Sequence, residues 1–150
     1  MRIVLQRVNQ ASVVIDNKLY SEIGFGMMLL LGIESLDDLS DADWLVSKVS
    51  QIRIFSDDEG KMNLSIDDIK GEFLVVSQFT LHSSTKKGNR PSYIQAARPV
   101  HAVPLYTYFC DQLAKVSGKT VKTGVFGADM KVSITNDGPV TICLDSKRKE

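Results

Sequence analysis

The first part of the chain alternates apolar and polar residues in a way that predicts β-strands. Residues 2–8, 11–16 and 18–23 are rich in Val and Ile, and a short polar turn separates the last two ranges. Residues 27–33 are apolar without alternation, which is typical of a strand that is covered on both faces. The chain therefore begins with a run of strands.

Two later stretches have helical periodicity. Apolar residues recur every three or four positions over 40–52, and Ser40 with Asp43 three residues later predicts a capping box. In the second stretch Pro104 suits the first turn of a helix, and Gly118 suits its end. We expect two main helices.

The remaining apolar runs predict further short strands, over 53–55, 72–78, 121–126, 131–135 and 140–144. The order is strands, helix, strands, helix, strands, without regular βαβ alternation and without a Gly-rich phosphate loop. We predict one α+β domain over residues 1–150, with a mostly antiparallel, barrel-like sheet and two main helices.

Composition limits the classes of function. Apolar residues make up 43% of the chain and charged residues 24%, as in an ordinary soluble domain. The 18 basic residues equal the 18 acidic ones, which argues against an extended duplex-binding surface. A single nucleotide or a strand end could still be bound.

The cysteines and the apolar runs indicate the compartment. Cys110 and Cys143 are far apart and are interpreted as buried free thiols in a reducing environment. There is no CxxC pair and no His/Cys cluster, so we expect no metal and no cofactor. Residues 1–7 are too polar for a signal peptide, and no run is long enough to span a membrane. We expect a cytoplasmic protein without membrane contact.

A Gly-Pro step stands between the last two predicted strands. Proline cannot donate to a β-ladder, so Pro139 predicts an edge or a bulge, and Gly138 before it indicates an unusual backbone. An X-Pro bond is also the one common site of a cis peptide. Such a backbone would present carbonyl and amide groups rather than side chains.

The segment Ser77-Gln78-Phe79-Thr80-Leu81, at the end of a predicted strand, carries the other candidate chemistry. Thr80 could donate a hydrogen bond to a developing oxyanion, or it could simply end the strand. Gln78, beside apolar neighbours, could orient a ligand hydroxyl or pin a neighbouring loop. Spacing alone favours the strand-ending interpretation of Thr80 and leaves the role of Gln78 open.

A self-contained hydrolytic triad is poorly supported. The chain has only His82 and His101, and no GxSxG elbow. On a strand, His82 would point to the same face as Thr80, so a contact between them is conceivable. We nevertheless expect a surface or structural role for both histidines.

Two further segments could bind a nucleotide. Lys87 and Arg90 lie in a long polar loop that could contact phosphate or could merely be solvated. Phe126 and Met130 flank a Gly-Ala-Asp segment and could form a shelf for a base, although core packing would explain them equally.

Taken together, these segments resemble one family closely, the D-aminoacyl-tRNA deacylases. The matching stretches span the chain in the family order: residues 1–8, 32–33, 77–81, 87–92, 124–130 and 136–141. His82-Ser83-Ser84 and Tyr93 depart from the family pattern, which puts local substrate contacts in doubt but not the family.

The resemblance implies a homodimer that hydrolyses the ester between a D-amino acid and the 3′-terminal adenosine of tRNA, a chiral proofreading reaction. The Gly138–Pro139 peptide would be cis, would enter the partner's pocket and would exclude L side chains, with Arg7 fixing it from behind. Glycine mischarged on tRNA-Ala would also be accepted.

The resemblance also implies how the reaction runs. Ser77, Gln78, Phe79 and Thr80 would form the catalytic floor, assisted by the 2′-hydroxyl of the RNA.

Two other classes of function stay open from the sequence. One is a non-catalytic module that binds RNA ends. The other is a hydrolase of free D-amino acid esters or peptides, which would act without RNA.

Overall fold

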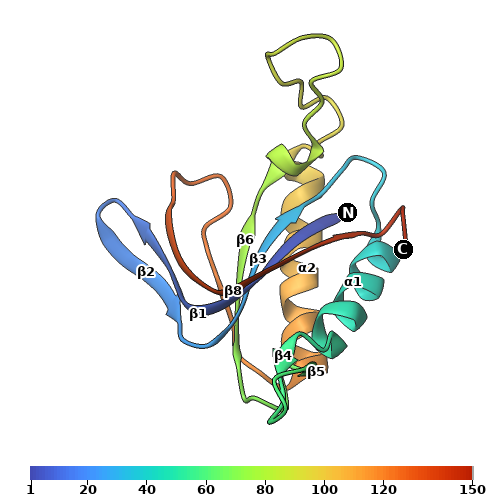
Figure 1. Ribbon diagram of the computed structural model, residues 1–150. Coiled ribbons are helices and arrows are strands. Elements are labelled where there is room, and N and C mark those ends of the chain that lie inside the picture. The colour runs from blue at the N-terminus through green and yellow to red at the C-terminus, as the bar shows by residue number, and fades with distance from the viewer. Residues whose placement is uncertain (150) are drawn as a thin grey trace.

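The computed structural model describes residues 1–149 and contains one mixed β-sheet, a two-stranded sheet and two α-helices (Figure 1). The strands of the main sheet are β1 (Arg2–Ile15), β2 (Lys18–Ile23), β3 (Gly26–Gly32), β6 (Glu72–Ser77), β7 (Val121–Thr123) and β8 (Lys131–Asp145). The small sheet pairs β4 (Phe55–Ser56) with β5 (Met62–Leu64), and a 3₁₀ helix, η1 (Phe79–His82), follows β6.

The long strand β1 organises the sheet. It pairs antiparallel with β3 through its first half, with β2 through its second half, and with β8 along its other edge. β6 joins β3 in parallel, and β7 joins β6 in parallel. The sheet curls until β2 meets β7, where Ser21 Oγ donates to the carbonyl oxygen of Thr123 at 2.7 Å. The predicted α+β fold with a barrel-like sheet is confirmed.

Apolar side chains fill both sides of the curled sheet. Met27, Leu29 and Leu31 of β3 belong to the core shared with the helices, whereas Met28 packs with Leu74 inside the curl. Six of the seven residues of β3 are buried and the other is half-buried, so the prediction that this strand is covered on both faces is confirmed.

The helices α1 (Leu39–Gln51) and α2 (Pro99–Ser117) lie side by side against one face of the sheet (Figure 1). The predicted caps are partly wrong. The N-cap of α1 is Asp38, whose carboxylate accepts from Ser40 N at 2.8 Å, and Asp41 completes the capping box. Asp38 with Asp41 and Ser40 with Asp43 have the same three-residue spacing, and the helix uses the earlier pair.

The start of α2 was also predicted too late. Pro99 occupies the first helical position, and Pro104 is exposed inside the helix. The end at Gly118, with φ of 65°, is as predicted. The early start matters because it places the first turn of α2 beside the site described below.

At two places where the sequence predicts a break between strands, the structure has one long strand with an irregular register. Residues 2–8 and 11–16 merge into β1, and residues 131–135 and 140–144 merge into β8. The β1–β8 register shifts between Gln6 and Val8 and again between Val8 and Gln10. The Gly-Pro step lies opposite the first of these shifts, so it is accommodated as an irregularity in a paired strand.

The two ends of the described chain are joined by polar contacts. The α-amino group of Met1 is buried and donates to Asp37 Oδ1 at 2.5 Å and to Ser146 Oγ at 2.9 Å. Cys110 is buried as predicted, but Cys143 is exposed because β8 shows that side to solvent. Within residues 1–149, no helix has the length and apolarity that a membrane crossing requires.

Candidate active site

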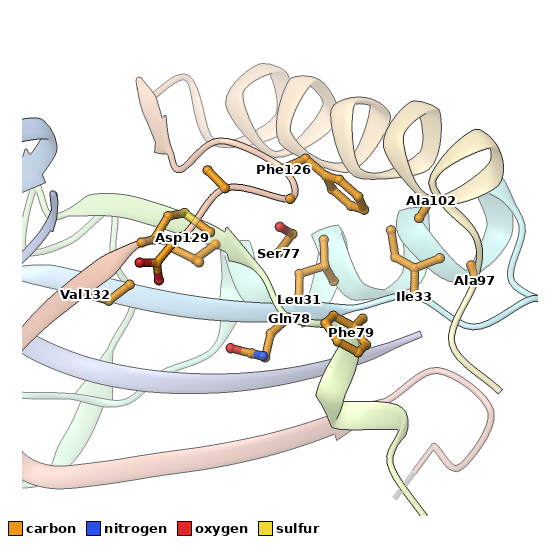
Figure 2. Close-up of a pocket in the computed structure, with 14 residues that line it drawn as sticks. Leu31, Ile33, Ser77, Gln78, Phe79, Ala97, Ala102, Phe126, Asp129 and Val132 are labelled. Carbon is orange, nitrogen blue, oxygen red and sulfur yellow. The ribbon is translucent and has the colours of Figure 1, made fainter. Parts of the chain in front are cut away.

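A cavity of about 320 Å³ opens where β3, β6 and the start of α2 meet (Figure 2). Its volume is in the range of small-molecule sites. The lining comes from β3 and the residue after it, the end of β6, the start of α2 and the segment that leads into β8. These residues are Leu31, Ile33, Val76–Phe79, Ala97, Ala102, Phe126–Met130 and Val132. Three of the four residues expected to form the catalytic floor line it, as do Phe126 and Met130.

The floor is the turn that leaves β6. Ser77 pairs with Leu31 in the parallel ladder, and Gln78 N donates to the carbonyl oxygen of Leu31 at 2.8 Å, after which the chain turns into η1. Gly32 permits this turn. A Cβ there would lie 2.9 Å from the carbonyl oxygen of Gln78 and 2.9 Å from Leu81 Cβ.

Gln78 and Thr80 are coupled. Gln78 Nε2 donates to Thr80 Oγ1 at 2.6 Å, and both residues are half-buried. Because the Thr80 hydroxyl accepts this bond, its own hydrogen is free to donate to a ligand. Thr80 lies in η1, so the alternative that it ends a strand is wrong.

His82 is not placed to activate Thr80. Its side chain has no exposed surface, and neither ring nitrogen has a hydrogen-bond partner within residues 1–149. Nδ1 lies 3.8 Å from a carboxylate oxygen of Glu34. The strand geometry assumed for residues 80–82 is replaced by a 3₁₀ turn, which sends His82 into the protein. The described part of the chain therefore forms no Ser/His/Asp arrangement at this turn.

The opposite wall is the segment between β7 and β8. Phe126 packs edge-to-face on Tyr106 of α2, with 6.1 Å between ring centroids, and hangs over the cavity opposite Ser77 (Figure 2). Met130 is half-buried and reaches the backbone at Gly124. The two residues form an apolar wall of the cavity and are also packed against the core, so both interpretations of this segment apply.

The groups beneath this wall are not reactive. Burial raises the pKa of the Tyr106 hydroxyl, which donates to the carbonyl oxygen of Val75 at 2.8 Å. Burial also raises the pKa of the Cys110 thiol to about 12, against a smaller opposing effect of its hydrogen bond with Tyr106. A thiol that stays protonated is a poor nucleophile.

The Gly138–Pro139 step lies in β8 and does not line the cavity of its own chain. Its peptide bond is cis, both residues are exposed, and Gly138 has φ of 121°, a region that favours glycine. A Cβ on Gly138 would lie 3.1 Å from Arg7 Nη2.

Arg7 holds this step from the side of β1. Only 8% of the residue is exposed. Its Nε donates to the carbonyl oxygen of Asp137 at 3.2 Å and lies 2.8 Å from Asp137 Oδ2, and its Nη1 donates to the carbonyl oxygen of Ile54 at 2.6 Å. One guanidinium therefore ties the Gly-Pro segment to the interior.

Lys87 and Arg90 are not brought into the cavity. Both are exposed on a hairpin of residues 84–92, which projects beyond the start of α2 (Figure 1). Sequence reasoning assigned no role to Gly32, Ala97 or Ala102, which shape the cavity. Small side chains carry no chemical signal of their own, so their role becomes visible only when their neighbours in space are known.

Comparison with known proteins places the chain. A family model described as D-Tyr-tRNA(Tyr) deacylase matches residues 4–145. Curated proteins named D-aminoacyl-tRNA deacylase from Bacteroides thetaiotaomicron and Flavobacterium psychrophilum are 59% and 58% identical, each over 150 residues and the full length of both chains.

Solved structures agree. One titled "c-Myc DNA Unwinding Element Binding Protein" is 41% identical with a TM-score of 0.90, covering 97% of this chain and 98% of that one. A second, titled as a "probable eukaryotic D-amino acid tRNA deacylase", has a TM-score of 0.81 over 95% and 97% of the two chains, and at 20% identity it shows the fold alone. The chain belongs to the D-Tyr-tRNA(Tyr) deacylase family.

Proposed function

We propose that this protein is an enzyme that hydrolyses the ester bond of D-aminoacyl-tRNA and releases the free D-amino acid and the tRNA. The observation that carries the proposal is the cavity lined by Ser77, Gln78 and Phe79 on one side and by Phe126 and Met130 on the other, with Thr80 bonded to Gln78, in a chain 59% identical over its full length to proteins named for this activity. A cavity of about 320 Å³ can hold the end of an aminoacylated strand but not a folded RNA.

In the proposed reaction a water oxygen attacks the ester carbonyl carbon, and the bond from that carbon to the ribose oxygen breaks. The departing ribose oxygen takes a proton that originates from the water. Within residues 1–149, the turn offers a hydroxyl on Thr80 and backbone amides, but no adjacent histidine base. We therefore assign Thr80, Gln78, Ser77 and Phe79 to positioning and oxyanion stabilisation, and proton transfer to the neighbouring 2′-hydroxyl of the RNA.

Selection against L-amino acids is assigned to Gly138 and Pro139 of a second copy. The step is exposed and firmly held by Arg7, yet it lies outside its own chain's cavity, so it can guard only another subunit's site. Within the described residues β8 pairs with β1 alone, and most of its residues are exposed or half-buried, so a homodimer could pack along its other edge. A main-chain barrier rejects the wrong hand whatever the D side chain is, so many D-amino acids, and glycine mischarged on tRNA-Ala, would be accepted.

The RNA contacts are assigned to the cavity wall and to the hairpin of residues 84–92. Phe126 and Met130 are assigned to the terminal adenosine, and Lys87 and Arg90 to phosphates of the strand that leads to it. A net charge of zero suits a protein that grips the acceptor end rather than the whole tRNA.

The test is to charge one tRNA with D-Tyr and with L-Tyr and to compare deacylation rates. Hydrolysis of the D ester alone is expected. Equal rates, or no rate above background, would contradict the proposal. Tight binding without turnover would indicate an RNA-end binding module. Equal hydrolysis of a 2′-deoxy substrate would indicate an esterase that does not need RNA.

A further inference from the structure

Two aromatic side chains stand exposed at the mouth of the cavity. Phe79 is 54% exposed and Tyr93 is 39% exposed, although aromatic rings of this size are usually covered. They pack edge-to-face with 5.0 Å between ring centroids and 72° between their planes. Phe79 also lines the cavity, so this aromatic step (Phe79 and Tyr93) continues the cavity wall outwards.

A basic hairpin, residues 84–92, lies immediately before Tyr93 in the chain. Its base is closed by two backbone hydrogen bonds between Ser84 and Ser92, at 2.8 and 2.9 Å. It carries Lys86, Lys87 and Arg90, all exposed. Within residues 1–149, none of these three cations is within ion-pair distance of a carboxylate. The hairpin is therefore a cluster of uncompensated positive charge next to an exposed aromatic surface.

We propose that the aromatic step binds the base of the nucleotide that precedes the terminal adenosine, while the basic hairpin contacts the phosphates of the same single strand. The inference rests on the proposed function and extends it from the last nucleotide to the one before. Single-stranded nucleic acid is recognised by aromatic faces interleaved with cations, because every base offers a π-face and every linkage a charge.

The order of the features along the surface supports this occupant. Moving outwards from the ester site, the surface presents the cavity, then the aromatic step, then the cations. In the proposed path, a strand whose end is in the cavity crosses the step before its phosphates reach the hairpin. A second copy of this chain has zero net charge, whereas a nucleic-acid strand carries a negative charge at every linkage, so the strand is the better match to the basic hairpin.

The experiment compares two D-tyrosyl esters. One is carried by an RNA minihelix with a single-stranded 3′ end, and the other by adenosine alone. For Tyr93→Ala we expect the ratio of kcat/KM on the minihelix to kcat/KM on the adenosine ester to fall by about 5- to 150-fold, the equivalent of about 1–3 kcal/mol for one stacked base. Tyr93→Phe, which keeps the ring, should retain the ratio.

An abasic site at the penultimate nucleotide provides the complementary change in the RNA. In the wild type it should lower the ratio of kcat/KM on the minihelix to kcat/KM on the adenosine ester as much as Tyr93→Ala does. In the Tyr93→Ala variant it should lower that ratio little further. Replacing Lys86, Lys87 and Arg90 by Ala should reduce the dependence of log KM on log salt by about 0.7 for each phosphate that the protein no longer neutralises. Lys115→Ala, an exposed lysine in the last turn of α2, is the matched control.

Three results would overturn the inference. They are an unchanged ratio in Tyr93→Ala, no effect of the abasic site on the wild type, and a change of oligomeric state in Tyr93→Ala, which would show that a second copy covers the step. If the wild type hydrolyses neither ester, the proposed function itself fails, and this outcome is distinct from the other three.

Discussion

Replacing Arg7 by Met tests how the Gly138–Pro139 step is held. The side chain keeps its apolar stem but loses every donor. The bond to the carbonyl oxygen of Ile54 is buried and from a charged group, so its loss costs about 2 kcal/mol. The contacts to Asp137 cost about 1 kcal/mol together, because that carboxylate is 33% exposed and screened by water.

The expected loss of stability is therefore about 3 kcal/mol, or roughly 6–12 °C in Tm for a domain of this size. Such a loss leaves a folded protein. The Gly-Pro segment can disfavour an L side chain by no more than the free energy needed to displace the segment. Loosening the Gly-Pro segment by about 1–2 kcal/mol should raise hydrolysis of L-Tyr-tRNA by roughly 5- to 30-fold.

The assay measures single-turnover rates on D-Tyr-tRNA and L-Tyr-tRNA, with Tm from thermal denaturation. Arg53→Met is the matched control, because Arg53 bonds Asn63 at an exposed site and has no contact with Asp137. It should leave the ratio of D to L rates unchanged. If Arg7→Met loses stability while the ratio stays at the wild-type value, Arg7 has only a structural role and the reasoning is refuted.

Three further changes have defined outcomes. Thr80→Ala should lower kcat by no more than roughly 10³-fold and keep its preference for D substrates; a trapped acyl-enzyme on Thr80 would contradict this. Gly32→Ala should lower kcat/KM by roughly 10- to 100-fold with a small change in Tm, because the new methyl group displaces the turn by a few tenths of an ångström; unchanged activity would mean that the turn is not critical. Burial alone would raise the pKa of Asp41, but hydrogen bonds from Lys147, Ser146 and the Asp38 backbone lower it to about 2. Asp41→Asn should therefore cost about 2 kcal/mol in urea unfolding at pH 7, and the difference should persist above about pH 4 and fade as the pH falls towards 2; a difference independent of pH would contradict the assignment.

Much of the fold could be predicted from apolar periodicity. The continuous run in β3 indicated burial on both faces, and Gly118 marked the end of α2. Helix starts were less predictable, because Asp38 with Asp41 and Ser40 with Asp43 have the same spacing, and packing decides between them. The length of β1 and β8 was missed because local irregularities within one paired strand look like strand ends.

The site was predicted through its unusual residues rather than its geometry. Gln78 and Thr80 were identified, but their mutual hydrogen bond depends on a 3₁₀ turn that residue types do not specify. The strand geometry that would bring His82 to the face of Thr80 is wrong for the same reason, whereas a structural role for His82 agrees with its complete burial. Gly32 and the alanines that shape the cavity could not be found, because a glycine or alanine shows its purpose only against its neighbours.

We propose that the Gly138–Pro139 step of one subunit guards the cavity of the other. Mixed dimers test it directly, built from one subunit with Arg7→Met and one with Ala97→Trp, which fills the cavity at Ala97. In the mixed dimer the Arg7→Met subunit keeps this cavity open, and under the proposal the intact step of its partner guards it. We predict that this dimer hydrolyses D-Tyr-tRNA and rejects L-Tyr-tRNA as the wild type does. Hydrolysis of L-Tyr-tRNA at the level of the Arg7→Met homodimer would show that each step guards its own cavity, and it would contradict the account.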